Sequence, residues 1–138
     1  MARNEDDIGF PGEPNDEREL LLEWLGYLRG AVLRKVEGID DEQARWTPDG
    51  RLIPLIGIVH HLTRVEWRWI EGGFRGADVD RSESEFAPGQ ELRITDAVVA
   101  YRERAAATDA AVRSMELAQR SEPDTWRAAS RFAGCCCT

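Results

Sequence analysis

The stretch LIPLIGIVHHLTRVEWRWIEGGF, residues 52–74, carries the pattern that decides the fold. Apolar residues recur in it at spacings of three and four, which is the period of an amphipathic α-helix. It also holds the two histidines of the protein, His60 and His61. We therefore expect one long helix that ends at Gly72 and Gly73 and carries any catalytic site. Its predicted apolar face consists of Leu55, Ile58, Val59, Leu62, Val65, Glu66 and Trp69.

A second helix is predicted ahead of this stretch, over residues 17–37. Asp16 suits its N-cap, and Gly38 suits the position just past its end, where glycine tolerates a left-handed backbone. A short turn of helix is expected at residues 39–45, with Asp40 as its cap. The apolar stripe of the 17–37 helix contains Leu21, Trp24, Leu25, Leu28, Ala31, Val32 and Val36.

A third helix is predicted over residues 95–119, with Thr95 as its cap. The segment 75–92 before it is polar and contains Pro88 and Gly89, so we predict a long surface loop there. Such a loop is either a cover over a pocket or a plain crossover connection. The apolar face of the third helix contains Ala97, Val98, Tyr101, Ala105, Thr108, Ala111, Val112 and Met115.

These elements fit one helical domain with two divergent ends. Residues 1–16 are expected to form an extended lead-in, residues 17–119 the helical bundle, and residues 120–138 a divergent C-terminal tail. In the tail only a short segment, 126–133, has a helical apolar pattern, and it is too short for a full fourth helix.

The charge balance limits the partners of the protein. Its 138 residues include 18 Lys and Arg against 26 Asp and Glu, a formal net charge of −8. This disfavours binding to nucleic acid, which needs a basic patch to displace phosphate counterions. The sequence has no apolar run long enough for a membrane span and no secretory signal. We therefore expect a cytoplasmic protein without nucleic-acid or membrane partners.

The histidines are the first candidates for a functional site. On a helical wheel His61 lies at the border of the apolar face, whereas His60 lies almost opposite the core. A border histidine with one hydrogen bond is the more common situation, since a catalytic zinc site needs about three protein ligands. Glu66 is a candidate acceptor or general base, but a carboxylate paired with an arginine is the commoner explanation. Trp24, Trp67 and Trp69 favour packing over ligand binding.

The cysteines give no second site. Cys135, Cys136 and Cys137 are consecutive, whereas structural zinc sites use pairs separated by two to four residues. We interpret them as exposed thiols that oxidise easily, with a redox or metal-binding tail as the minor alternative. The sequence contains no glycine-rich phosphate loop and no nucleophile elbow.

Three segments together resemble a known family. They are ERELLLEWLGYLRGAVLRKVEGIDDEQARW (17–46), LIGIVHHLTRVEWRWIEGGFRG (55–76) and TDAVVAYRERAAATDAAV (95–112). In order and spacing they are similar to the DinB-like superfamily, and most similar to its small mycothiol-dependent transferases. The resemblance implies an all-α, up-down four-helix bundle with a long crossover loop. It also implies a divalent metal, zinc or nickel, and a low-molecular-weight thiol such as mycothiol that is joined to an electrophile.

The resemblance gives His61 the role of a metal ligand. In the family two further histidine ligands come from a His-x-x-x-His pair on the fourth helix, and this sequence has no such pair. The fourth helix is therefore expected to be truncated or replaced, metal binding to be weak or absent, and thiol transfer to be impaired. The alternative is a non-catalytic, degenerate bundle. Three amphipathic helices would leave an apolar groove that favours a homodimer or another interaction.

Overall fold

The computed structural model describes residues 11–12 and 16–118, and all regular structure in this part of the chain is helical. The predicted all-α fold is confirmed. The elements are the α-helices α1 (Glu17–Val36), α2 (Asp41–Arg45), α3 (Leu55–Trp67) and α4 (Ile94–Ser114), the π-helix η1 (Arg68–Phe74) and the 3-10 helix η2 (Glu83–Phe86).

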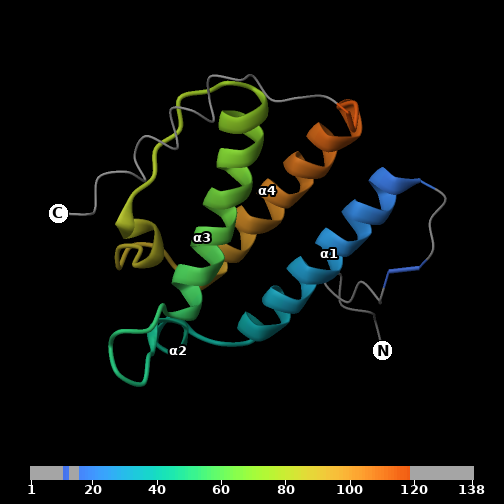
Figure 1. Cartoon of the computed structure of the whole chain (residues 1–138). Helices are drawn as coiled ribbons and strands as arrows, with labels where there is room; N and C mark the ends of the chain where they lie inside the picture. Colours follow the sequence, from blue (N-terminus) through green and yellow to red (C-terminus); the bar gives the residue numbers. More distant parts are fainter. Residues whose placement is uncertain (1–10, 13–15, 119–138) are drawn as a thin grey trace.

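Three long helices pack around one another, joined by a crossover (Figure 1). In that view α1 runs downward, and α3 and α4 both run upward. The chain between Phe74 and Ile94 returns along the outside of α3, so the crossover connection is confirmed. The predicted short segment at 126–133 and the expectation that the fourth helix is truncated or replaced concern residues outside the described part of the chain.

The apolar core sits at the α2 end of the bundle. Ile56 and Val59 of α3 are fully buried there, and Tyr101 of α4 is nearly so. The rest of the core cluster comes from α1, α2 and α4: Leu33, Val36, Ala44, Ile94 and Ala97. No described helix is both long and apolar enough to span a membrane.

The local signals at α1 and α2 act as predicted. The Asp16 carboxylate accepts a hydrogen bond of 2.8 Å from the backbone N–H of Arg18. After α1, Gly38 adopts a φ of +73°, which only glycine takes without strain. Asp40 and Gln43 form a reciprocal capping box around the start of α2.

The helix that begins at Leu55 runs past the two glycines expected to end it. It widens to a π-helix at Arg68 and ends after Phe74, with Gly76 at a φ of +71°. Gly72 is buried within it. A Cβ at this position would lie 2.4 Å from a side-chain methyl of Val79, so only glycine leaves enough space. Its role is therefore to let the crossover pack closely, and the predicted end at Gly72 was wrong.

The start of α4 also differs from the prediction. Thr95 lies inside the helix, and the cap position belongs to Arg93, whose side chain makes no capping hydrogen bond. The cap comes from another element: the carboxylate of Asp41 on α2 accepts a 2.7 Å hydrogen bond from the N–H of Ile94. The helix ends at Ser114, several residues before the predicted end.

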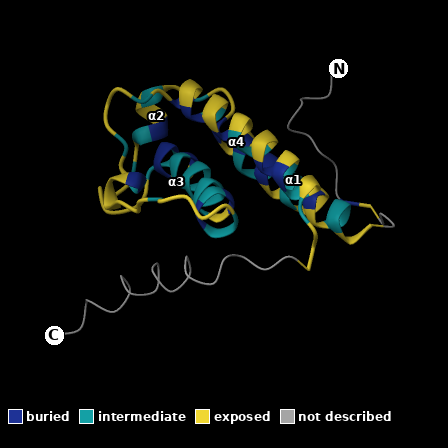
Figure 2. Ribbon diagram, turned by 90° about the horizontal axis from the view of Figure 1, so that it is seen from above, coloured by how far each residue is buried: buried dark blue, intermediate teal, exposed yellow. Residues whose placement is uncertain are grey.

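The predicted apolar stripe of α1 is confirmed only toward the end of the helix, where Val36 is buried in the core and Val32 packs against it. Leu21 and Leu28 are 55% and 56% exposed, whereas Leu22, Arg29 and Leu33 are buried. Figure 2 shows the buried residues of α1 and α4 where these helices run side by side. The prediction for α4 is confirmed at Ala97, Tyr101, Thr108 and Ala111, all of which are buried.

Candidate functional site

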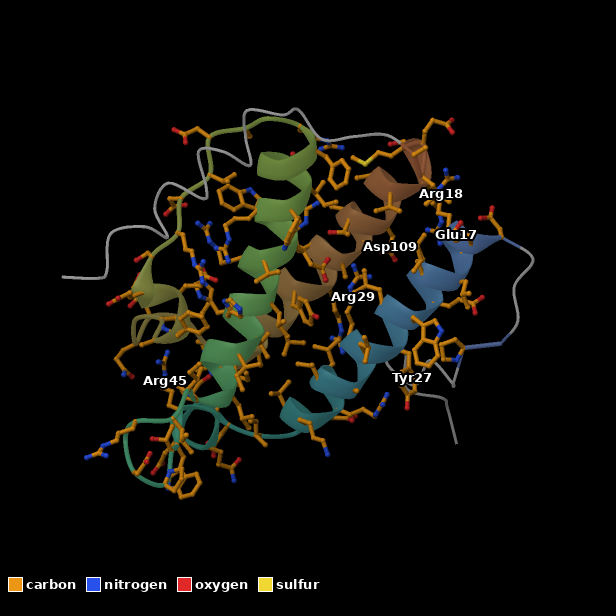
Figure 3. All side chains as sticks on the ribbon, viewed as in Figure 1. Glu17, Arg18, Tyr27, Arg29, Arg45 and Asp109 are labelled. Atoms are coloured by element: carbon orange, nitrogen blue, oxygen red, sulfur yellow. The ribbon has the colours of Figure 1, made fainter. Side chains whose placement is uncertain are left out.

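Two clusters of charged side chains hold the helices together away from the apolar core. The interior cluster consists of Arg29 of α1, Glu66 of α3 and Asp109 of α4. The guanidinium donates to both oxygens of Glu66, at 2.8 and 2.7 Å, and to Asp109 at 2.7 Å. Figure 3 shows Arg29 and Asp109 meeting between α1 and α4. The cluster therefore joins all three long helices.

The charged groups of the interior cluster interact with one another. Arg29 and Glu66 are only 6% and 12% exposed. Burial acts to lower the pKa of Arg29, but its hydrogen bonds and charge interactions with the two carboxylates hold that pKa above the ordinary value. Nearby, burial and then the charge of Glu66 raise the pKa of Tyr101 to about 12. The expectation that Glu66 pairs with an arginine is confirmed, since both of its carboxylate oxygens accept hydrogen bonds from Arg29.

The crossover cluster consists of Glu85 of η2, His61 of α3 and Arg68 of η1. Glu85 is 3% exposed. Its carboxylate accepts a 2.5 Å hydrogen bond from Nδ1 of His61 and a 2.8 Å bond from Arg68, whose other terminal nitrogen contacts the second oxygen. Burial alone would raise the pKa of Glu85, but Arg68 and His61 hold it below its ordinary value. The carboxylate is therefore ionised at neutral pH.

His60 also contacts Glu85, which the helical wheel did not predict. Its Nδ1 lies 2.8 Å from the backbone carbonyl oxygen of Glu85. His60 also lines a surface hollow of about 410 Å³. The remaining lining residues are Ser84, Pro88, Gly89, Glu91 and Leu92. Both imidazoles thus face the crossover, and His60 is not isolated from the rest of the fold.

The crossover lies close against α3 because Gly57 leaves room for it. A Cβ on Gly57 would lie 2.0 Å from the carbonyl oxygen of Phe86. The Phe86 ring stacks on the imidazole of His61, with 4.3 Å between ring centroids. At its far end the crossover is tied to α2, since Arg45 donates to the carbonyls of Pro88, Gly89 and Leu92. These contacts fix the surroundings of His61.

The described residues do not complete a metal site. Among residues 16–118 no three His, Cys, Asp or Glu side chains come together in a way that could hold an ion. His61 has one favourable feature: a carboxylate binds its Nδ1, which is how metal-binding histidines are commonly oriented. One imidazole is nevertheless not enough for zinc. The three consecutive cysteines lie outside the described residues.

Sequence reasoning did not single out Glu85 as a candidate site residue. It lies 24 positions after His61 in a polar segment whose other acids are exposed, so no spacing signal distinguishes it. The three tryptophans were predicted to pack in the core or at its rim, and none of them is buried. Trp24 packs edge-to-face against Tyr27, Arg64 stacks over Trp67, and Trp69 is about half exposed.

Comparison with known proteins agrees with this architecture. The family model described as mycothiol-S-transferase matches residues 20–133, most of the chain. The matched range covers α1 to α4 and continues past the boundary at residue 119 that the sequence pattern predicts. Comparisons with curated proteins and with solved structures find no match. The three packed helices, the crossover and this match together place the chain in the mycothiol-S-transferase family, within the DinB-like superfamily.

Proposed function

We propose that this chain is a thiol S-transferase domain whose activity is impaired. Its thiol is of the mycothiol type, and its second substrate is a small electrophile. The family match supports the reaction class. The observation that carries the site is the pair formed by His61 and Glu85, since a buried carboxylate holds the imidazole by one nitrogen. The other nitrogen, Nε2, makes no hydrogen bond to the described residues and is available to a ligand.

His61 is the metal ligand that we propose for this site. The expected metal is zinc or nickel, bound weakly or not at all, because the sequence holds two histidines and both lie on α3. We place the protein in the cytoplasm, with small molecules as its partners. The net charge of −8 argues against nucleic acid as a partner.

Metal content and thiol transfer test this proposal together. The full chain is purified with zinc present, its metal content is measured, and mycothiol consumption is followed with a chlorinated nitroarene as test electrophile. We expect well under one equivalent of zinc and a slow transfer that His61→Gln abolishes. His60→Gln is the matched control, and it should keep the wild-type rate.

Two results would contradict the proposal in different ways. One equivalent of tightly bound zinc would show that the metal site is complete, and impairment would be wrong. Slow thiol consumption that is equal in wild type and His61→Gln would show that the reaction does not use this site.

A second candidate function is a non-catalytic module that forms a homodimer. Exposed apolar residues of α1, α3 and η1 favour it: Leu21, Leu28, Ile58 and Trp69. An apolar hollow of about 160 Å³ lies where the last turns of α1 meet the start of α3, lined by Val32, Val36, Leu55 and Ile58 among others. In a symmetric homodimer these residues of one copy would contact the same residues of the second copy. Light scattering should then give a dimer that Leu28→Glu dissociates, and a wild-type monomer would contradict this function.

A further inference from the structure

One residue of the crossover, Glu85, holds both imidazoles of the protein. Its backbone carbonyl oxygen lies 2.8 Å from Nδ1 of His60, and its carboxylate lies 2.5 Å from Nδ1 of His61. The two histidines are adjacent in sequence and differ by about 100° in direction around the helix. A single acceptor residue reaches both because η2 lies against α3, where Gly57 leaves room for it.

The chemistry of the acceptors decides where the ring protons are. A carbonyl oxygen can only accept, so Nδ1 of His60 must carry a hydrogen. An ionised carboxylate also can only accept, and the double contact with Arg68 keeps Glu85 ionised. Nδ1 of His61 therefore carries a hydrogen as well. In a neutral imidazole the second nitrogen, Nε2, is then left as an acceptor.

We propose that Glu85 is a positioning residue that holds His61 in the Nδ1–H form, so that Nε2 is presented as an acceptor or ligand to the thiol site. The use of Nε2 in a thiol site rests on the proposed function. The tautomer itself follows from the geometry alone. Arg68 and the stacked ring of Phe86 keep the pair in one orientation, since they contact Glu85 and His61 respectively.

Nitrogen-15 NMR of the imidazole rings tests the proposal on metal-free protein. Spectra are recorded over a series of pH values, and the tautomers are assigned from the spectra whose nitrogen-15 shifts show neutral rings. Wild-type His60 and His61 should both show the Nδ1–H pattern. In Glu85→Ala, His61 should change to the Nε2–H form that free imidazole side chains favour, whereas His60 should keep Nδ1–H, because its acceptor is the backbone.

Two further variants complete the test. Glu85→Gln keeps an oxygen acceptor and should restore the Nδ1–H pattern of His61 at least in part. Glu83→Ala, an exposed acid in the same 3-10 helix, is the matched control and should change neither ring. A wild-type His61 in the Nε2–H form would overturn the proposal without any variant. A Glu85→Ala spectrum in which both rings change would also overturn it. The Glu85 side chain would then only keep the crossover against α3 and would not select the tautomer of His61.

The outcome is separable from that of the proposed function. Thiol transfer and metal content do not enter the NMR measurement. If the Nδ1–H form is found and transfer is absent, the transferase proposal fails and the positioning role stands. If transfer depends on His61 but its ring is in the Nε2–H form, the positioning role fails and the transferase proposal stands.

Discussion

The interior cluster and the crossover cluster use the same pair of groups, an arginine and a buried carboxylate, for different ends. In the interior cluster Arg29 donates hydrogen bonds to Glu66 and Asp109, and these bonds join three helices. In the crossover cluster Arg68 neutralises Glu85, and an imidazole completes the group. The first contains no imidazole, whereas the second contains His61. Glu66 therefore helps to join three helices, whereas Glu85 contacts His61, the proposed metal ligand.

The largest effect is expected from breaking the interior cluster. Arg29→Met leaves two carboxylates facing each other without a cation, at a place where water has little access. We expect a loss of about 3–5 kcal/mol in the free energy of unfolding, measured by urea denaturation. Arg34→Met, at an exposed position of the same helix, is the control and should cost under about 1 kcal/mol. Similar losses for the two variants would mean that the cluster is not structural.

Tyr101 reports the negative charge and burial of the interior cluster. In a Tyr27→Phe background its phenol should ionise with a pKa of about 12, measured by tyrosinate absorbance. An unfolded tyrosine ionises near pH 10, so folding keeps the proton on. The stabilisation this gives is fully present below about pH 10 and is lost as the pH rises through the folded pKa of about 12. An ordinary pKa for Tyr101 would contradict its burial beside Glu66.

A smaller effect is expected where the crossover meets α3. Gly57→Ala places a methyl group 2.0 Å from the carbonyl oxygen of Phe86, so η2 must move outward. We expect a loss of about 1–3 kcal/mol and a changed NMR signal of His61. Gly73→Ala is the matched control, because its Cβ would meet nothing closer than 3.9 Å. If both variants are equally stable, the close contact between η2 and α3 is wrong.

The smallest effect is expected from a surface pair that resembles the clusters only in composition. Arg113 and Glu19 join the end of α4 to the start of α1, but both side chains are largely open to solvent. Water and salt screen such a pair. Arg113→Ala should leave the urea midpoint unchanged at moderate salt. A loss comparable with that of Arg29→Met would mean that exposure does not separate these pairs.

The sequence predicted α4 better than α1, and packing explains why. On α4 one apolar face meets α1 and α3, so periodicity and burial coincide at Ala97, Tyr101 and Ala111. On α1 the predicted stripe is exposed at Leu21 and Leu28 and buried only at Val36, and the buried face includes a charged residue, Arg29. A helical wheel counts apolar residues, so it did not include Arg29 in the buried face. Arg29 is buried only because its partners stand on two other helices, 37 and 80 residues away.

The candidate site was half predictable for a related reason. His61 was found because it lies on the border of a periodic helix. Glu85 was not found, because its importance depends on where the crossover folds back. That path is set by the room beside Gly57 and Gly72, and neither glycine adopts an unusual backbone angle. Close approach of this kind leaves no mark in local periodicity.

The five-residue helix α2 has a consequence for how the molecule opens. It is too short to be stable alone, yet Asp41 caps α4 and Arg45 holds three carbonyls of the crossover. Loss of α2 would free the first amide of α4 and the end of the crossover at once. The surroundings of the imidazoles and the start of α4 are thus expected to exchange amide hydrogens as one cooperative unit, and the middle of α4 later.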